Sequence, residues 1–219
     1  MKLLAYKKAD FSSPIITVHE ALHLRRQYPE EWEGKHFYDL IKLRPMVPVD
    51  RGVKSSSFAY LGGSGDGHGN GSKGIAHELV QEYVCKLLEW RIRVFGKEFL
   101  LKIDETSDEW SVHDDRSGLN YTVDCQLGLS PESDLYYETS GVIGIEVTDT
   151  HKTGPRKKKA LARAGLIILE LQMITDWHVA NDVKITSKEL NLLRKRIFCF
   201  LNKGTTSLSC LCKPSHVRI

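Results

Sequence analysis

Two acidic residues stand inside apolar, β-branched segments, where a charged side chain is unusual. Asp124 follows Tyr-Thr-Val, and Glu146 lies between Ile145 and Val147. Each acid alone could simply be a charge on an edge strand facing water. A buried carboxylate, however, is costly unless a cation or metal ion pairs with it. Mg²⁺ prefers hard oxygen ligands, usually one or two carboxylates. If the two segments are neighbouring strands, the pair predicts a Mg²⁺ or Mn²⁺ site suited to phosphodiester hydrolysis.

A strongly basic segment follows the second acid. Residues 150–169 contain six Lys or Arg residues and no acid. A charge run is usually a solvated helix face, but such faces normally mix the two signs, and this one does not. A basic helix beside a metal site would contact the phosphate backbone of DNA, and one of its lysines could stabilise charge on the scissile phosphate. The expected DNA contacts are Lys152, Arg156, Lys158, Lys159 and Arg163.

The hydrophobic pattern predicts the elements that must position these residues. The helical stripe of residues 75–94 predicts a long helix ended by Gly96. Strands are expected at 98–104, 119–129, 140–150 and 166–171, and the polar segment 106–118 is typical of turns. A basic helix at about 156–164 would have Pro155 in its first turn, and a last helix at 187–201 would have Ser187 as its N-cap. The crossover through the basic helix makes its two flanking strands parallel. The fold class is therefore α/β, a sandwich with a mixed sheet.

The remaining segments suggest a simple domain division. Residues 1–60 would be an N-terminal extension with a short strand, a helix and an extended segment. Residues 61–74 form a Gly-rich loop without the order of a phosphate-binding loop. This loop is either a connector or a segment in which His68 or Lys73 touches phosphate. Residues 75–175 would form the catalytic core, and 176–219 a C-terminal helix and tail.

Composition restricts the function classes only weakly. Hydrophobic residues make up 41% and charged residues 27% of 219 residues, as in an ordinary globular protein. The net charge of +3 gives little information about partners. The first residues lack an apolar signal segment, and no apolar run is long enough to span a bilayer, so we expect a cytoplasmic protein with no membrane contact. The five cysteines are expected to be reduced. The spacing of Cys199, Cys210, Cys212 and His216 favours free thiols over a zinc site.

The motifs together resemble a branch of the PD-(D/E)XK nuclease superfamily, the competence-protein CoiA-like nucleases and related phage and bacterial proteins. The similarity covers about residues 57–172. Its most specific block runs from Glu146-Val-Thr-Asp-Thr150-His151 through Lys157 and Gly165 to Leu169-Glu170-Leu171. The resemblance implies a restriction-endonuclease-like α/β/α sandwich with a mixed central sheet. It also implies a metal-dependent nuclease with DNA as its partner.

The resemblance also assigns roles to individual residues. Asp124 and Glu146 would bind Mg²⁺ or Mn²⁺ and act in catalysis. Lys157 would replace the usual lysine two places after the second acid, where this chain has Thr148; Lys152 or Lys158 could serve instead. His151 would lie at the mouth of the site, contacting phosphate or a metal-bound water, or only hydrogen-bonding the loop.

Residues of the first helix give a weaker expectation. Glu78, or Glu82, would complete the metal site; the simpler interpretation of Glu78 is an acid favoured by the helix N-terminus. His77 could equally be a core or cap residue. Gln81 stands where the resembling helix has a lysine, which is a departure from the pattern.

Three function classes follow. The first is a Mg²⁺- or Mn²⁺-dependent deoxyribonuclease, in which cutting both strands would require a homodimer or sequential nicks. The alternative is a catalytically inactive DNA-binding protein of the same fold, because Thr148 cannot supply a positive charge. The third is a structural or regulatory protein whose basic helix binds an acidic partner. Only this last class predicts that Asp124 and Glu146 lie apart.

Overall fold

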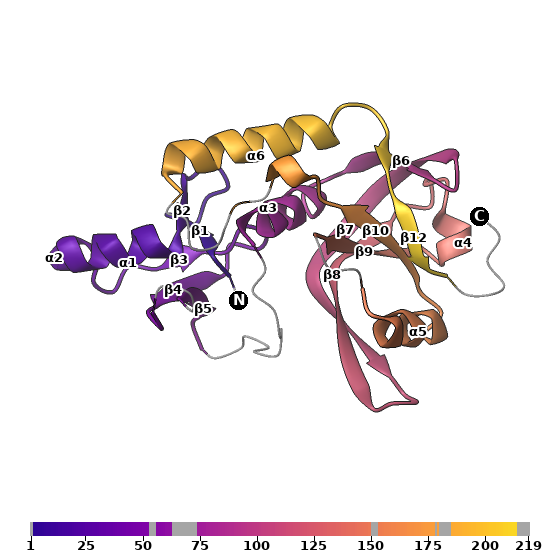
Figure 1. Cartoon of the computed structure of the whole chain (residues 1–219), viewed down its shortest axis with the longest axis horizontal. Helices are drawn as coiled ribbons and strands as arrows, with labels where there is room; N and C mark the ends of the chain where they lie inside the picture. The colour runs from indigo at the N-terminus through magenta and orange to yellow at the C-terminus, as the bar shows by residue number, and fades with distance from the viewer. Residues whose placement is uncertain are drawn as a thin grey trace. The chain divides into compact units, whose positions relative to one another are not determined.

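The computed structural model describes residues 2–52, 56–62, 74–149, 153–177, 179 and 185–213 (Figure 1). The chain divides into two compact units, each made of two separate stretches. Unit 1 comprises Met1–Leu79 and Asp176–Ile197, and unit 2 comprises Val80–Thr175 and Phe198–Ile219. Two of the three boundaries fall inside helix α3 (Ile75–Val84) and helix α6 (Ser187–Leu201), and the third falls within the 3₁₀ helix η1 (Thr175–Trp177). This division differs from the expected extension, core and tail, because the N-terminal segment builds a unit with a sheet of its own.

The described residues of unit 1 form a five-stranded sheet with the order β2-β1-β3-β4-β5. Its strands are β1 (Leu4–Tyr6), β2 (Ile15–Thr17), β3 (Phe37–Tyr38), β4 (Pro45–Val49) and β5 (Ser57–Tyr60), and neighbouring strands run antiparallel. Helices α1 (Val18–Gln27) and α2 (Pro29–Trp32) connect β2 to β3. The expected short strand, helix and extended segment of this region are confirmed.

Two helices are tied to strand β1 within unit 1. The Glu78 carboxylate of α3 accepts hydrogen bonds from the backbone N–H groups of Leu3, at 2.6 Å, and Leu4, at 3.1 Å. Arg194 of α6 donates to the Tyr6 hydroxyl at 3.0 Å. Tyr6 is fully buried, so these contacts fix both helices to the core of the unit.

Over the described residues, unit 2 carries a seven-stranded sheet with the order β11-β6-β7-β8-β9-β10-β12. The strands are β6 (Glu89–Val94), β7 (Lys97–Asp114), β8 (Leu119–Leu129), β9 (Val142–Thr148), β10 (Ile167–Gln172), β11 (Thr206–Ser207) and β12 (Ser209–Cys212). β9 and β10 are parallel, as are β6 and β11, and the other neighbours are antiparallel. The short helices α4 (Tyr136–Thr139) and η1 (Thr175–Trp177) lie in connections. The α/β class with a mixed sheet is confirmed.

The predicted crossover is present as β9, helix α5 (Pro155–Arg163) and β10. Figure 1 shows α5 beside the sheet, and Leu161 on this helix packs with Val123 and Ile168 of the strands. A side chain at residue 144 would force a rearrangement of the sheet's core, because a Cβ there would lie 2.4 Å from Cδ1 of Ile168. Gly144 thus leaves room for neighbouring core side chains to pack against β9, two positions before Glu146.

The expected helix over residues 75–94 is wrong beyond Val84. The second half is strand β6, in which the buried Trp90, Ile92 and Val94 alternate with exposed residues. A period of two belongs to a strand, but Ile92 also continues the helical stripe of the preceding residues. Gly96 does not end a helix. It forms the tight turn between β6 and β7, with a positive φ of 76°.

Two further boundaries differ from expectation. The polar segment 106–118 is not mainly turn: β7 continues to Asp114 and pairs with β8 along its length. Polar residues are compatible with a strand that has one solvated face. The last helix has the expected bounds, but its N-cap is Thr186. The Thr186 hydroxyl accepts from Glu189 N at 3.2 Å, and Glu189 accepts from Thr186 N at 2.8 Å, which is a capping box. Among the described residues, no helix has the length and apolar character needed to cross a membrane.

Candidate functional site

The sheet of unit 2 brings the two predicted acids together. Cys125 of β8 pairs with Ile145 of β9, so Asp124 and Glu146 are the next residues along two adjacent strands. The backbone N–H of Val147 donates to Oδ2 of Asp124 at 2.9 Å. Asp124 is 7% exposed and Glu146 is 5% exposed. Two carboxylates are therefore held side by side, largely out of water, where their charge requires compensation.

Helix α5 supplies a cation to this pair. Nζ of Lys157 lies 2.6 Å from Oε1 of Glu146. Pro155 is the first residue of α5. Lys157 therefore lies in the first turn of the helix, close to the end of β9. A partner cation offsets part of the cost of burying a carboxylate. Of the three candidate lysines, Lys157 and Lys158 are described, and Lys157 is the one whose ammonium group contacts Glu146.

Gln81 of α3 holds the backbone at the first acid. Its side-chain Nε2 donates to the carbonyl oxygen of Asp124 at 2.9 Å, and Gln81 is fully buried. From the sequence alone, Gln81 is only a departure from the expected lysine. No sequence signal identifies a helix residue that supports a strand more than forty positions later. The contact makes Gln81 a positioning residue for Asp124.

A third carboxylate lies on the next strand. Glu170 of β10 is the direct register partner of Glu146 in the parallel ladder, so both side chains are on the same face. Oε2 of Glu170 accepts from the Ser209 hydroxyl at 3.1 Å. Its Oε1 is buried and has no hydrogen-bond partner within the described part of the chain. A buried, unpartnered carboxylate oxygen beside Glu146 favours a cation in this region.

Thr148, which stands where the resembling family has a lysine, is buried. Thr148 is 4% exposed, and its hydroxyl donates to Oε1 of Gln172 on β10 at 3.1 Å. Nearby on β12, burial and the neighbouring Cys210 raise the pKa of the Cys212 thiol to about 11. Cys212 is therefore a neutral thiol at physiological pH, and the candidate site has no thiolate from this residue.

The basic residues of α5 differ in exposure and in their contacts. Arg156 and Lys159 are exposed, and Lys158 is half-buried. Arg163, in contrast, donates from Nε to Oδ1 of Asp114 at 3.1 Å and from Nη2 to Oδ2 at 2.5 Å. Hydrogen bonds from Arg163, and next from Ser117, lower the pKa of Asp114 to about 2. Arg163 thus anchors α5 to the end of β7, and its expected DNA contact stays a prediction.

Asp114 was missed by sequence reasoning. It stands in a polar run, Asp114-Asp115-Arg116, that has the composition of a turn, and its partner Arg163 lies far along the chain. Only the extension of β7 brings the two side chains together.

The expected metal role of Glu78 has a competing explanation. Its two oxygens accept the backbone N–H groups of Leu3 and Leu4 within unit 1, and burial raises the pKa of its carboxyl. These contacts favour a structural role, and the metal assignment stays a prediction. Glu82 in unit 2 is buried and pairs with Lys86, whose Nζ lies 2.6 Å away. His151, Lys152 and Thr150 lie outside the described residues, as do His68, Lys73 and His216.

The donor set around Asp124 fits a hard divalent cation. The described residues contain no group of three His, Cys, Asp or Glu side chains arranged around one metal position. Mg²⁺ does not need such a group, because it is often held by one or two carboxylates together with water and substrate oxygens. Asp124 and Glu146 meet this requirement, and the unpartnered Oε1 of Glu170 adds negative charge beside them.

Comparisons of the chain with protein-family models, with curated proteins and with solved structures found no match. The chemistry of the site therefore has to be inferred from its own residues.

Proposed function

We propose that this chain is a Mg²⁺- or Mn²⁺-dependent deoxyribonuclease with a restriction-endonuclease-like core. The observation that supports the proposal best is the contact of Lys157 with Glu146 directly beside Asp124. Two adjacent strand carboxylates and a lysine from the following basic helix match the needs of phosphodiester hydrolysis. The β9-α5-β10 crossover on a mixed sheet is consistent with the proposed core.

Each residue has a distinct role in this proposal. A divalent ion held by Asp124 and Glu146 would supply water activation and charge neutralisation. Lys157, whose ammonium group pairs with Glu146, stabilises the negative charge of the scissile phosphate. Gln81 keeps the backbone of Asp124 in place. The remaining basic residues of α5, Arg156, Lys158 and Lys159, bind the phosphates of the DNA backbone on either side.

The direct test is DNA cleavage by the purified chain. Supercoiled and linear DNA are incubated with Mg²⁺, Mn²⁺ or EDTA, with the native chain and with the variants Asp124→Asn and Glu146→Gln. We expect metal-dependent cutting that both variants lose. Asp104→Asn is the matched control, because Asp104 is an exposed acid of the same sheet, and this variant should cut normally. Cutting that persists in both site variants would overturn the proposal.

One observation favours the alternative of an inactive DNA-binding protein. Thr148 occupies the usual lysine position and is held by Gln172, so no cation reaches the site from this strand position. DNA binding measured by fluorescence anisotropy separates the two functions. Salt-sensitive binding without cutting in any metal would support the alternative, and restoring a cation with Thr148→Lys would then be the next variant. A dimer, which double-strand cutting would favour, is tested by sedimentation with and without DNA.

A further inference from the structure

A second group of metal-binding side chains lies in unit 1, away from the residues proposed for nuclease chemistry. Helix α1 contains the sequence His19-Glu20-Ala-Leu-His23. Residues four apart share one face of a helix, with Cβ atoms about 5–6 Å apart. Two imidazoles at this spacing form a bidentate site for a transition-metal ion, and the same spacing occurs in the H-E-x-x-H helices of zinc enzymes. The motif therefore raises two possibilities, a metal chelate and a hydrolytic zinc site.

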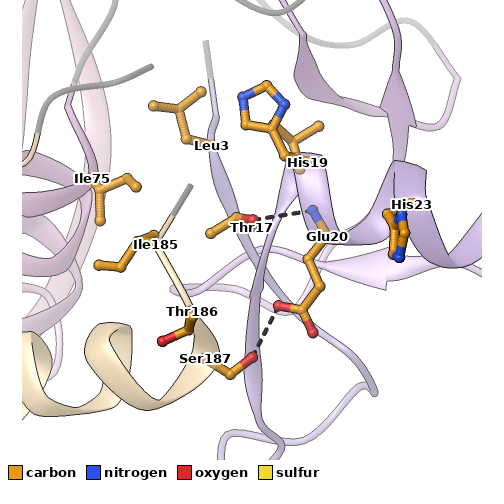
Figure 2. Close-up of a pocket in the computed structure, with 10 residues that line it drawn as sticks. Leu3, Thr17, His19, Glu20, His23, Ile75, Ile185, Thr186 and Ser187 are labelled. Atoms are coloured by element: carbon orange, nitrogen blue, oxygen red, sulfur yellow. Dashed lines mark hydrogen bonds between the residues drawn. The ribbon is translucent and has the colours of Figure 1, made fainter. Parts of the chain in front are cut away.

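The two histidines border a cavity. Its volume is about 430 Å³, and it lies within unit 1 between the first turn of α1, the start of α3 and the segment leading into α6. Figure 2 shows His19, Glu20 and His23 around this cavity with the apolar side chains of Leu3, Ile75 and Ile185. His19 is half-buried and His23 is exposed, so an ion can reach both rings from solvent.

Glu20 does not behave as the free carboxylate of a hydrolytic site. Its backbone N–H donates to the Thr17 hydroxyl at 3.2 Å, which makes it part of the helix cap. Nζ of Lys7 lies 3.3 Å from its Oε1, and the Ser187 hydroxyl donates to its Oε2 at 2.9 Å. Both carboxylate oxygens are engaged in holding the start of α1. The contacts of Glu20 therefore argue against a hydrolytic zinc site and leave the metal chelate as the interpretation to test.

The imidazoles themselves are available. Within the described part of the chain, neither His19 nor His23 takes part in a hydrogen bond or ion pair. Neutral imidazole is a good ligand for Zn²⁺, Ni²⁺ and Cu²⁺ and a poor one for Mg²⁺. Since no third His, Cys, Asp or Glu joins them in a metal-binding group among the described residues, two protein ligands leave coordination positions open to water or to a ligand in the cavity.

We propose that His19 and His23 together bind one late first-row transition-metal ion at the mouth of this cavity. The site differs in chemistry from the carboxylate pair at Asp124 and Glu146, because nitrogen ligands select a different class of metal. The proposal stands whether or not the chain is a nuclease.

The test is a titration of the full chain, without any histidine tag, with Ni²⁺ in excess Mg²⁺. The Mg²⁺ keeps carboxylate sites from contributing. We expect one Ni²⁺ per chain by calorimetry, and binding weakened at least about tenfold in His19→Asn and in His23→Asn, since even loss of a supporting contact costs that much. His36→Asn is the matched control, because His36 is an exposed histidine of the same unit, and it should bind Ni²⁺ as the native chain does.

Thermal unfolding separates loss of the site from loss of the fold. In EDTA, the native chain and the two variants should melt at the same temperature. With Ni²⁺, the native chain should gain thermal stability, because a ligand that binds only the folded state stabilises it, and the variants should not. Undiminished Ni²⁺ binding by either variant, or no binding by the native chain, would overturn the proposal.

Discussion

Nζ of Lys157 lies 2.6 Å from Oε1 of Glu146, so a largely buried ion pair joins the basic helix to the strand that carries the second acid. The four consecutive basic residues of α5 are therefore not equivalent. Lys157 is directed to the carboxylates, whereas Lys159 is exposed. This difference predicts separate roles for the two lysines, Lys157 in catalysis and Lys159 in DNA binding.

Replacing Lys157 with Met should reduce single-turnover DNA cutting by about 10²–10³-fold, the usual effect of losing one group that stabilises the transition state. DNA affinity should change little, because Lys157 faces the carboxylates and not the solvent. Lys159→Met is the control, with cutting retained and binding modestly weaker at low salt. If Lys157→Met cuts DNA at the native rate, Lys157 has no catalytic role.

Asp114 should contribute to acid stability. Its pKa is about 2 in the folded chain, below the ordinary 3.8, because Arg163 and Ser117 hydrogen-bond the carboxylate. A lowered pKa means that the ionised form stabilises the fold; this contribution is complete above the ordinary pKa and disappears as the pH falls toward about 2. Asp114→Asn should lower stability at neutral pH and flatten the loss of stability below about pH 4. The measurement is urea unfolding at a series of pH values.

Asp115→Asn is the matched control for this pH dependence. Asp115 is the next residue along the chain, and its side chain is fully exposed. The native pH dependence should persist in this variant. An equal flattening in both variants would show that the Arg163 contact is not its source.

Gly144→Ala should lower the free energy of unfolding by about 1–3 kcal/mol, the usual cost of overpacking a core. The new Cβ would lie 2.4 Å from Cδ1 of Ile168 and 3.1 Å from Cγ1 of Val123. Adding Ile168→Val removes the nearest atom and should recover part of the loss, which urea unfolding of the double variant measures. Gly154→Ala should cost less, because no atom of the described residues lies within 4 Å of a Cβ there and only the preference for Gly at the N-cap of α5 is lost. Absence of any recovery would mean that the clash is not with Ile168.

Glu78→Ala should destabilise the chain by about 1–3 kcal/mol for each of the backbone donors of Leu3 and Leu4 that it leaves unpaired. Mg²⁺ affinity measured at a temperature where the variant is folded should be unchanged if Glu78 is structural. Glu31→Ala, which removes an exposed acid of the same unit, should change neither property. A large loss of Mg²⁺ affinity with the fold intact would instead assign Glu78 to the metal site.

The sequence was sufficient for the part of unit 2 that carries the acids. Residues 119–129 and 166–171 are rich in apolar and β-branched residues, and they account for β8 and most of β10. Pro155 marks the start of α5 because its missing N–H is tolerated there. Since a crossover of this kind makes its strands parallel, the parallel direction of β9 and β10 could be predicted from local pattern, whereas the register that pairs Glu146 with Glu170 could not.

Other features depend on partners far along the chain and could not be read from local pattern. Ile92 fits the helical stripe as well as a strand, and only pairing with β7 decides between the two structures. The polar stretch from Thr106 to Asp114 gained its strand structure from β8. The short strands of unit 1 contain few residues each, so no periodic pattern develops in them.

Two of the three unit boundaries fall within long helices, α3 between Leu79 and Val80 and α6 between Ile197 and Phe198. Domains are usually separated at exposed linkers, where the chain can be cut or recombined without loss. A protein fragment that ends at the α3 boundary or at the α6 boundary would contain only part of that helix. A fragment beginning at Val80 would keep Gln81 but lose the turn of α3 that precedes it. We therefore expect the two units to be expressed together, and to be kept or lost together in evolution.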